Sequence, residues 1–140
     1  MGAPYTARCA CGSVTATIRG EPVGVRQCWC RQCQQISAGG ATTNAMFRVA
    51  DIELNGELAT HGYLADSGNT LTQSFCPTCG TAVMGRSSAR PHLRTLRFGF
   101  LDEGHGLAPT AAIWLDEAPP WATIDPALER FDRQPPAPPS

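Results

Sequence analysis

The sequence predicts a mainly β fold built from antiparallel strands, with one short helix near the C-terminus. Several short segments alternate between apolar and polar side chains, which is the period of a strand with one buried face. Glycine, proline and asparagine separate these segments at short intervals, as turns between antiparallel strands require. Only one short segment of the 140 residues carries the signals of a helix.

The predicted strands follow one another along most of the chain. Residues 13–18 are apolar at every second position, and Pro22 follows in a turn. A second short strand, at residues 23–27, leads into the middle of the cysteine-rich part of the sequence. Asn55 and Gly56 form a strong hairpin-turn signal. The remaining predicted strands cover residues 42–49, 52–54, 58–63, 70–75, 81–84, 93–101 and 113–115.

The C-terminal part of the chain carries the helix signals. A helix is predicted at residues 126–131, with Asp125 as the N-cap residue and Pro126 at the first helical position. Residues 134–140 contain four prolines and are predicted to form a disordered tail. Because the sequence contains no internal repeat and no linker, we expect a single domain at residues 1–133.

Composition and charge exclude several classes of function. With 42% hydrophobic residues the chain can form a core without disulfides, and a formal net charge of −1 argues against a nucleic-acid partner. All 11 basic residues are arginine, so chemistry that depends on lysine, such as Schiff bases, pyridoxal phosphate or a P-loop, is excluded. No segment resembles a signal peptide or a membrane span, so we expect a cytoplasmic protein without a membrane partner.

Seven cysteines lie in three groups, and their number favours metal binding over disulfides. The groups are Cys9 and Cys11, then Cys28, Cys30 and Cys33, then Cys76 and Cys79. An odd number does not divide into disulfides, cysteines two positions apart are strained disulfide partners, and the cytoplasm keeps thiols reduced. Disulfides and a thioredoxin-type redox role remain as alternatives.

The two outer pairs together provide four thiolates. Cys9 and Cys11 can point the same way from one strand end, because alternate residues of a strand share a face. The sequence around Cys76 and Cys79 resembles a zinc knuckle, and a glycine follows the second cysteine of each pair. We expect these four residues to form a closed zinc site with a structural role.

Cys28, Cys30 and Cys33 can hold a second zinc ion with a vacant fourth position. Two alternatives remain: an iron–sulfur cluster, and a site closed by a histidine. The histidines of the chain are His61, His92 and His105. Three thiolates make zinc a weak Lewis acid and favour a soft fourth ligand. The pattern therefore predicts a thiol as the substrate.

The order of the cysteine motifs resembles that of a known family. The motifs are C-x-C-G at residues 9–12, C-x-C-x-x-C at residues 28–33 and F-C-x-x-C-G at residues 75–80. In this order and spacing they resemble the glutathione-dependent formaldehyde-activating enzyme (GFA) family, which is related to the domain of centromere protein V and has a β-tent fold. The resemblance extends from about residue 5 to residue 131.

This resemblance implies a function and a role for each cysteine. It implies a structural zinc on Cys9, Cys11, Cys76 and Cys79, and a catalytic zinc on Cys28, Cys30 and Cys33. The family's reaction joins glutathione and formaldehyde to form S-(hydroxymethyl)glutathione, so the resemblance implies a carbon–sulfur lyase with a small thiol and an aldehyde as partners. Trp29 stands where many members have a histidine, a difference that concerns the substrate and leaves the metal ligands intact.

Residues beside the middle cysteines have weaker assignments. Arg31 is a candidate for attracting a substrate carboxylate, and the neighbouring glutamines for hydrogen-bonding a peptide-like thiol, although all of them are also ordinary surface residues. The glutamines are Gln32, Gln34 and Gln35. Trp29 can form a pocket wall or part of the core, and we expect Trp114 and Trp121 in the core.

Two functions of other classes compete with the enzyme. One is a noncatalytic zinc scaffold that binds another protein, and the other is a thiol-based metal or redox sensor. An intact middle group of cysteines favours catalysis over the scaffold. The sequence leaves the oligomeric state and the identity of the thiol and the aldehyde open.

Overall fold

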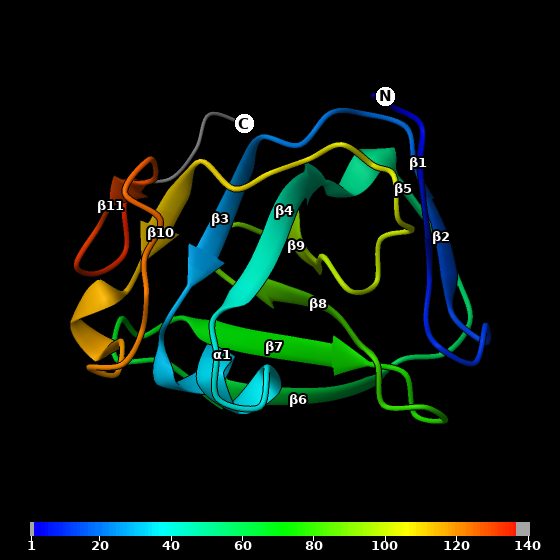
Figure 1. The fold of residues 1–140 in the computed structure, drawn as a ribbon. Helices are drawn as coiled ribbons and strands as arrows, with labels where there is room; N and C mark the ends of the chain where they lie inside the picture. Colours follow the sequence, from blue (N-terminus) through cyan, green and yellow to red (C-terminus); the bar gives the residue numbers. More distant parts are fainter. Residues whose placement is uncertain (1, 137–140) are drawn as a thin grey trace.

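The computed structural model describes residues 2–136 and contains two β-sheets with one short α-helix (Figure 1). The strands are β1 Tyr5–Arg8, β2 Thr15–Ile18, β3 Gly24–Cys28, β4 Thr42–Arg48, β5 Ile52–Asn55, β6 Ala59–Leu64, β7 Thr70–Phe75, β8 Ala82–Ser87, β9 Leu93–Arg97, β10 Ala111–Ile113 and β11 Glu129–Arg130. The helix is α1, Arg31–Ile36, and two 3₁₀ turns, η1 Val49–Asp51 and η2 Leu115–Glu117, follow β4 and β10. The prediction of a mainly β fold is confirmed.

The smaller sheet has three antiparallel strands in the order β1-β2-β5. In β1, Tyr5 and Ala7 are buried while Thr6 and Arg8 are exposed, so this strand has the alternation typical of strands. The sequence analysis placed Cys9 and Cys11 at a strand end but gave no range for a strand before them. An isolated bridge between Ala7 and Leu101 connects this sheet to the segment that follows β9.

The larger sheet has eight strands in the order β11-β10-β3-β4-β9-β8-β7-β6. The neighbouring strands from β3 to β6 in this order are antiparallel, whereas β10 pairs in parallel with both β3 and β11. The pairing of β8 with β9 comprises only two residue pairs, which join Met84 to Leu96 and Gly85 to Thr95. At this short junction the sheet bends, and Figure 1 shows β3 and β4 running steeply across the direction of β6 and β7.

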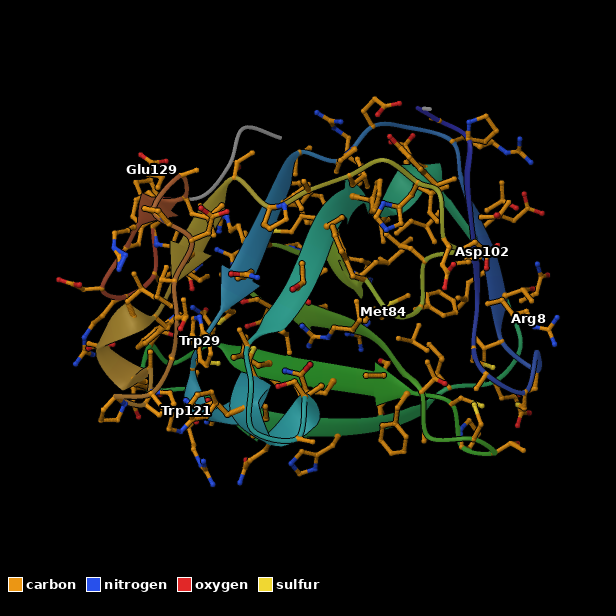
Figure 2. The ribbon with its side chains drawn as sticks, in the orientation of Figure 1. Arg8, Trp29, Met84, Asp102, Trp121 and Glu129 are labelled. Carbon is orange, nitrogen blue, oxygen red and sulfur yellow. The ribbon has the colours of Figure 1, made fainter. Side chains whose placement is uncertain are left out.

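The hydrophobic core lies between the bent large sheet and the small sheet. Its largest fully buried side chains include Phe47, Phe100, Ile18 and Leu96. Figure 2 shows Met84 in the interior of the molecule, and its side chain is buried. Two cysteines, Cys9 and Cys76, are as fully buried as these apolar side chains.

The predicted C-terminal helix is wrong. Asp125 caps a single turn, in which its side chain accepts a hydrogen bond from the N–H of Ala127 at 2.9 Å. Beyond this turn the backbone pairs with β10: the N–H of Glu129 donates to the carbonyl of Thr110, and that of Phe131 to the carbonyl of Ala112. Pairing with the sheet thus replaces the helix by β11. The helix of the structure, α1, was not predicted.

Other boundaries differ for local reasons. The predicted strand at residues 93–101 ends at Arg97, because the N–H of Phe100 turns back to the carbonyl of Arg97. The strand predicted at residues 113–115 ends at Ile113, because Trp114 has a left-handed backbone with φ of 58°.

The predicted tail lies partly outside the described residues, which end at 136. Within the described part, the side chain of Gln134 accepts a hydrogen bond from Nε1 of Trp114 at 3.1 Å. In residues 2–136, none of the helices has the length and apolar character needed to cross a membrane.

Gly56, in the turn between β5 and β6, packs closely against the backbone of Ser13, and this contact can be tested. Its φ is +103°, and a Cβ atom there would lie 2.1 Å from the carbonyl oxygen of Ser13. We expect Gly56→Ala to lower the free energy of unfolding by about 3 kcal/mol, measured by urea unfolding under reducing conditions. In the control Gly68→Ala, φ is +88° but no atom lies within 4 Å, so about 1 kcal/mol is expected. Equal losses in the two variants would contradict the close contact with Ser13.

Candidate functional site

The two outer cysteine pairs come together in space. The Sγ atoms of Cys9, Cys11, Cys76 and Cys79 all lie within 4.8 Å of one another. The Sγ of Cys11 lies 3.7 Å from that of Cys9 and 3.8 Å from that of Cys76. Cys9 and Cys11 follow β1, and Cys76 and Cys79 follow β7, so the group connects the small sheet to the large one.

Two similar turns shape this group. Gly12 has φ of 81° and Gly80 has φ of 79°, a region that glycine enters without strain. The N–H of Gly12 donates to the carbonyl of Cys9 at 3.0 Å, and the N–H of Gly80 to that of Cys76 at 2.9 Å. The glycine after each pair therefore closes a knuckle, as the sequence indicated.

Hydrogen-bond donors surround these sulfur atoms. The N–H of Val14 donates to the Sγ of Cys9 at 3.3 Å, and the N–H of Cys79 donates to the Sγ of Cys76 at 3.4 Å. Hydrogen bonds from the hydroxyl and the backbone of Thr81 lower the pKa of the Cys79 thiol to about 5. These donors favour thiolates, the form in which cysteine binds metals.

The middle cysteines form a second group at the junction of β3 and α1. Cys28 is the last residue of β3, Cys30 is the N-cap of α1, and Cys33 lies in the helix. Their Sγ atoms lie within 4.8 Å of one another. The Sγ of Cys30 also accepts a hydrogen bond from the N–H of Cys33 at 3.4 Å, so this cysteine takes the place of the usual capping residue.

The three thiols lie close together, and their pKa values therefore differ from one another. Hydrogen bonds from Cys28 and Cys30 lower the pKa of Cys33 to about 3 against the effect of burial, and the charge of Arg97 lowers it further. Hydrogen bonds with Cys30 and Cys33, followed by burial, raise the pKa of Cys28. Three close sulfur atoms cannot all carry a negative charge without a cation, which a metal ion would provide.

Both groups fit a soft divalent metal. Each contains sulfur donors alone, and tetrahedral sulfur sites are typical of zinc. Within residues 2–136, neither group includes a histidine or a carboxylate, so none of the three histidines closes the middle group. The cysteines are all free thiols, without disulfides.

A cavity borders the three middle cysteines. It lies between the two parts of the large sheet that meet at the bend, β3, β4 and β9 on one side and β6, β7 and β8 on the other. Cys28, Cys30 and Cys33 form part of its wall, whereas the outer four cysteines do not. The lining residues within the described chain include no aspartate, glutamate, histidine or lysine. Four arginines line it: Arg26, Arg86, Arg90 and Arg97.

This excess of positive charge is not balanced by ion pairs. In the described residues the salt bridges join Arg19 to Glu53 and Arg133 to Asp116, and none of these four residues lines the cavity. Burial, followed by the charge of Arg90, lowers the pKa of Arg26. The cavity therefore favours a ligand with negative charge.

Four hydrogen-bonded polar side chains lie in the cavity wall; Asn44 and Arg97 are buried, and Gln73 and Tyr63 are half-buried. Arg97 is only 7% exposed, and its Nη1 donates to Oδ1 of Asn44 at 2.8 Å. Its Nη2 donates to Oε1 of Gln73, and Nε2 of Gln73 donates to the hydroxyl of Tyr63 at 3.3 Å. These hydrogen bonds thus connect strands β4, β9, β7 and β6 within the cavity wall.

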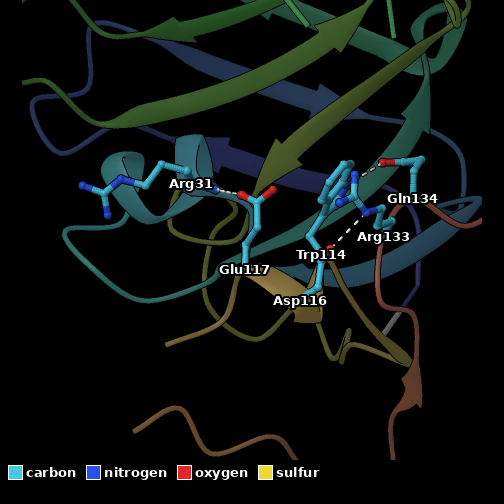
Figure 3. A network of polar contacts seen from close by, with 6 residues as sticks. All are labelled: Arg31, Trp114, Asp116, Glu117, Arg133 and Gln134. Atoms are coloured by element: carbon cyan, nitrogen blue, oxygen red, sulfur yellow. Dashed lines mark hydrogen bonds and ion pairs between the residues drawn. The ribbon is translucent and has the colours of Figure 1, made fainter. Parts of the chain in front are cut away.

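The segment after β10 supports α1 from below (Figure 3). Oε1 of Glu117 accepts a hydrogen bond from the N–H of Arg31 at 2.8 Å. Nε2 of Gln34 donates to the carbonyl of Trp29 at 2.8 Å and to that of Glu117 at 3.0 Å. These bonds fix the helix that carries Cys30 and Cys33.

The polar residues proposed from the sequence lie outside the cavity. Within the described lining, Arg31 and its neighbouring glutamines are absent. Gln34 is buried and structural, as its hydrogen bonds show, whereas Gln32 and Gln35 are exposed.

Trp114 and Trp121 differ from the expectation that they lie in the core, whereas Trp29 agrees with one of its two predicted places. Trp29 is buried, and Nε1 of its side chain has no hydrogen-bond partner among the described residues. Trp121 is 68% exposed, so its expected place in the core is wrong; it packs edge-on against Trp29 at a centroid distance of 6.1 Å (Figure 2). Trp114 is half-buried, lines the cavity and lies 5.6 Å from the guanidinium of Arg133.

Sequence reasoning missed the cavity residues Arg26, Tyr63 and Arg97. Each lies within a predicted strand, where the alternation shows that two faces exist. It does not show that the sheet bends and brings these faces together around the middle cysteines. An arginine between apolar neighbours, as at Arg97, was the available signal.

Comparisons with known proteins agree with this architecture. The model of the glutathione-dependent formaldehyde-activating enzyme family matches residues 4–117, and the chain belongs to this family. A crystal structure of a protein from Rhodobacter sphaeroides has a similar fold, with a TM-score of 0.56 and 21% sequence identity over 74% of this chain and 91% of that chain. No curated protein matches the sequence.

Glu117 offers a test of how the site is positioned. We expect Glu117→Ala to lower the free energy of unfolding by about 1 kcal/mol, because the N–H of Arg31 loses its acceptor. Glu117→Gln keeps an oxygen acceptor and should remain close to wild type in thermal unfolding.

Asp116→Ala is the matched control, since it removes only the ion pair with Arg133, whose side chain is 72% exposed. Such exposed pairs contribute little. Equal effects of Glu117→Ala and Asp116→Ala would contradict a capping role for Glu117.

Proposed function

We propose that the protein is a zinc-dependent carbon–sulfur lyase or synthase that acts on thiol–aldehyde adducts and resembles S-(hydroxymethyl)glutathione synthase. The observation that carries this proposal is the three-cysteine group in the wall of a cavity. Membership of the family supports the same conclusion.

In this proposal the two groups of cysteines have different roles. Cys9, Cys11, Cys76 and Cys79 hold a structural zinc, because four thiolates complete a tetrahedron and the group joins two sheets. Cys28, Cys30 and Cys33 hold the catalytic zinc. A zinc ion bound there would keep a substrate thiol deprotonated near neutral pH.

The other cavity residues would orient the substrate. The arginines provide positive charge for the carboxylates of a thiol such as glutathione, and Arg26 and Arg90 have no carboxylate partner among the described residues. The lysine-free chain cannot capture the aldehyde as a lysine Schiff base, so in this proposal noncovalent contacts hold the aldehyde. Catalysis would then come mainly from placing the thiolate and the carbonyl together.

The proposed reaction can be tested directly by NMR exchange spectroscopy. Zinc-loaded protein should accelerate exchange between free glutathione and its hydroxymethyl adduct in the presence of formaldehyde. Cys30→Ser should return the exchange to the spontaneous rate. Serine is a good N-cap residue, so this variant keeps the start of α1 while it removes one thiolate.

Cys79→Ser is the control for the other group. It opens a site whose metal contributes on the order of 10 kcal/mol to the folded state, so it should lower thermal stability far more than Cys30→Ser. If wild-type protein with full zinc occupancy shows no acceleration with glutathione or with a panel of other cellular thiols, the enzyme proposal fails in favour of a zinc scaffold.

A further inference from the structure

We propose that Tyr63 is a catalytic residue whose phenol donates a proton to the aldehyde oxygen as the thiol adds to the carbonyl. This inference rests on the proposed function and names the proton donor of that reaction. It is carried by the place of Tyr63 in the cavity and by the direction of its hydrogen bond with Gln73.

Tyr63 lies on β6 and lines the same cavity as Cys28, Cys30 and Cys33. Within the described lining there is no histidine, lysine or carboxylic acid. Arginine does not release its proton in proteins, and serine and threonine hydroxyls do not ionise in the ordinary pH range. With the cysteines assigned to the metal, the phenol is the remaining group suited to donate a proton.

The hydrogen bonds behind the site fix the orientation of this phenol. Arginine has donors only, so the atom of Gln73 that meets Nη2 of Arg97 must be the acceptor Oε1. The amide nitrogen Nε2 of Gln73 must then face Tyr63 and donate to its oxygen. The phenol oxygen is therefore an acceptor in this contact, and its own hydrogen has no acceptor among the described residues.

Arg97 fixes the orientation of two amide side chains, because its two Nη atoms donate to Gln73 and to Asn44. Its other arm donates to Oδ1 of Asn44, so Nδ2 of Asn44 faces Thr42, to whose hydroxyl it donates at 2.9 Å. Both amides are thus fixed by one buried cation. The O–H of Tyr63 is left free for a ligand in the cavity.

Addition of the thiolate to the carbonyl requires one proton, which Tyr63 donates. The sulfur of the substrate thiolate forms a bond to the carbonyl carbon, and the π electron pair of the carbonyl moves to its oxygen. That oxygen takes the proton of Tyr63 and becomes the hydroxyl of the adduct, and the phenolate regains a proton from water. Breakdown of the adduct follows the same steps in reverse.

The surroundings of Tyr63 keep the phenol protonated before the step. Burial raises the pKa of the Tyr63 phenol, and the hydrogen bond from Gln73 and the charge of Arg97 oppose this effect. A protonated phenol can donate throughout the neutral pH range.

Tyr63→Phe tests the proposal, and Tyr5→Phe is its matched control. These are the two tyrosines of the chain, and the hydroxyl of Tyr5 donates to Glu21 away from the cavity. Tyr63→Phe should slow glutathione–formaldehyde exchange by about 100-fold or more. Its zinc content and its dissociation constant for glutathione, measured by calorimetry, should equal those of wild type. Tyr5→Phe should keep the wild-type rate.

A second variant tests the direction of the hydrogen bond. In Gln73→Glu the carboxylate accepts from Arg97 and also from Tyr63, which turns the phenol hydrogen away from the cavity. We expect Gln73→Glu to slow exchange in the wild-type background and to have no further effect in the Tyr63→Phe background.

The outcomes separate this inference from the proposed function. A wild-type rate in Tyr63→Phe would overturn the role of Tyr63 and leave the enzyme proposal intact. Loss of glutathione affinity in parallel with the rate, or equal slowing by Gln73→Glu in both backgrounds, would also overturn it. Absence of exchange above the spontaneous rate in wild-type protein would remove both proposals.

Discussion

The structure depends on cysteine sulfur atoms that are packed closely enough to require a cation. Seven sulfurs lie in two groups, and within each group all ligand atoms lie within 4.8 Å of one another. As thiolates they repel one another unless a cation lies between them, and the thiolate is the form in which cysteine binds a metal. The outer group joins turns that are far apart in sequence, so it fixes the small sheet against the large one and helps to close the core around Cys9 and Cys76.

The two groups of sulfur donors lie in different surroundings. The outer group lies at two knuckle turns that complete a set of four sulfurs. The middle group lies at the end of β3 and the start of α1, where the bent sheet leaves a cavity beside three sulfurs. Arg97 stabilises this bend from within, since its guanidinium bridges Asn44 on β4 and Gln73 on β7. The positive charge of the cavity and the free hydrogen of Tyr63 follow from that arrangement.

The cysteine spacing predicted both groups and their four-and-three division, because ligands of one metal must meet in space whatever the intervening fold. The alternation of side chains also predicted most strands. Local signals failed where tertiary contacts decided the outcome: Asp125 and Pro126 start a turn, but pairing with β10 extends the chain beyond it. The helix α1 was not predicted because its N-cap is Cys30, which is not one of the usual capping residues, and because the hydrogen bond that supports its first turn comes from Glu117, far away in the sequence. The cavity residues Tyr63 and Arg97 could not be assigned, since no local pattern shows which strands face each other across a bend.

In the proposed function, protein sulfur closes one metal site and the other site accepts an external thiol. Zinc X-ray absorption spectroscopy on the fully loaded protein tests it most directly. The account predicts a major sulfur shell near 2.3 Å together with a minor shell of oxygen or nitrogen near 2.0–2.2 Å, and glutathione should replace the minor shell by sulfur. An all-sulfur environment before glutathione is added, or a light-atom shell that glutathione leaves unchanged, would contradict it.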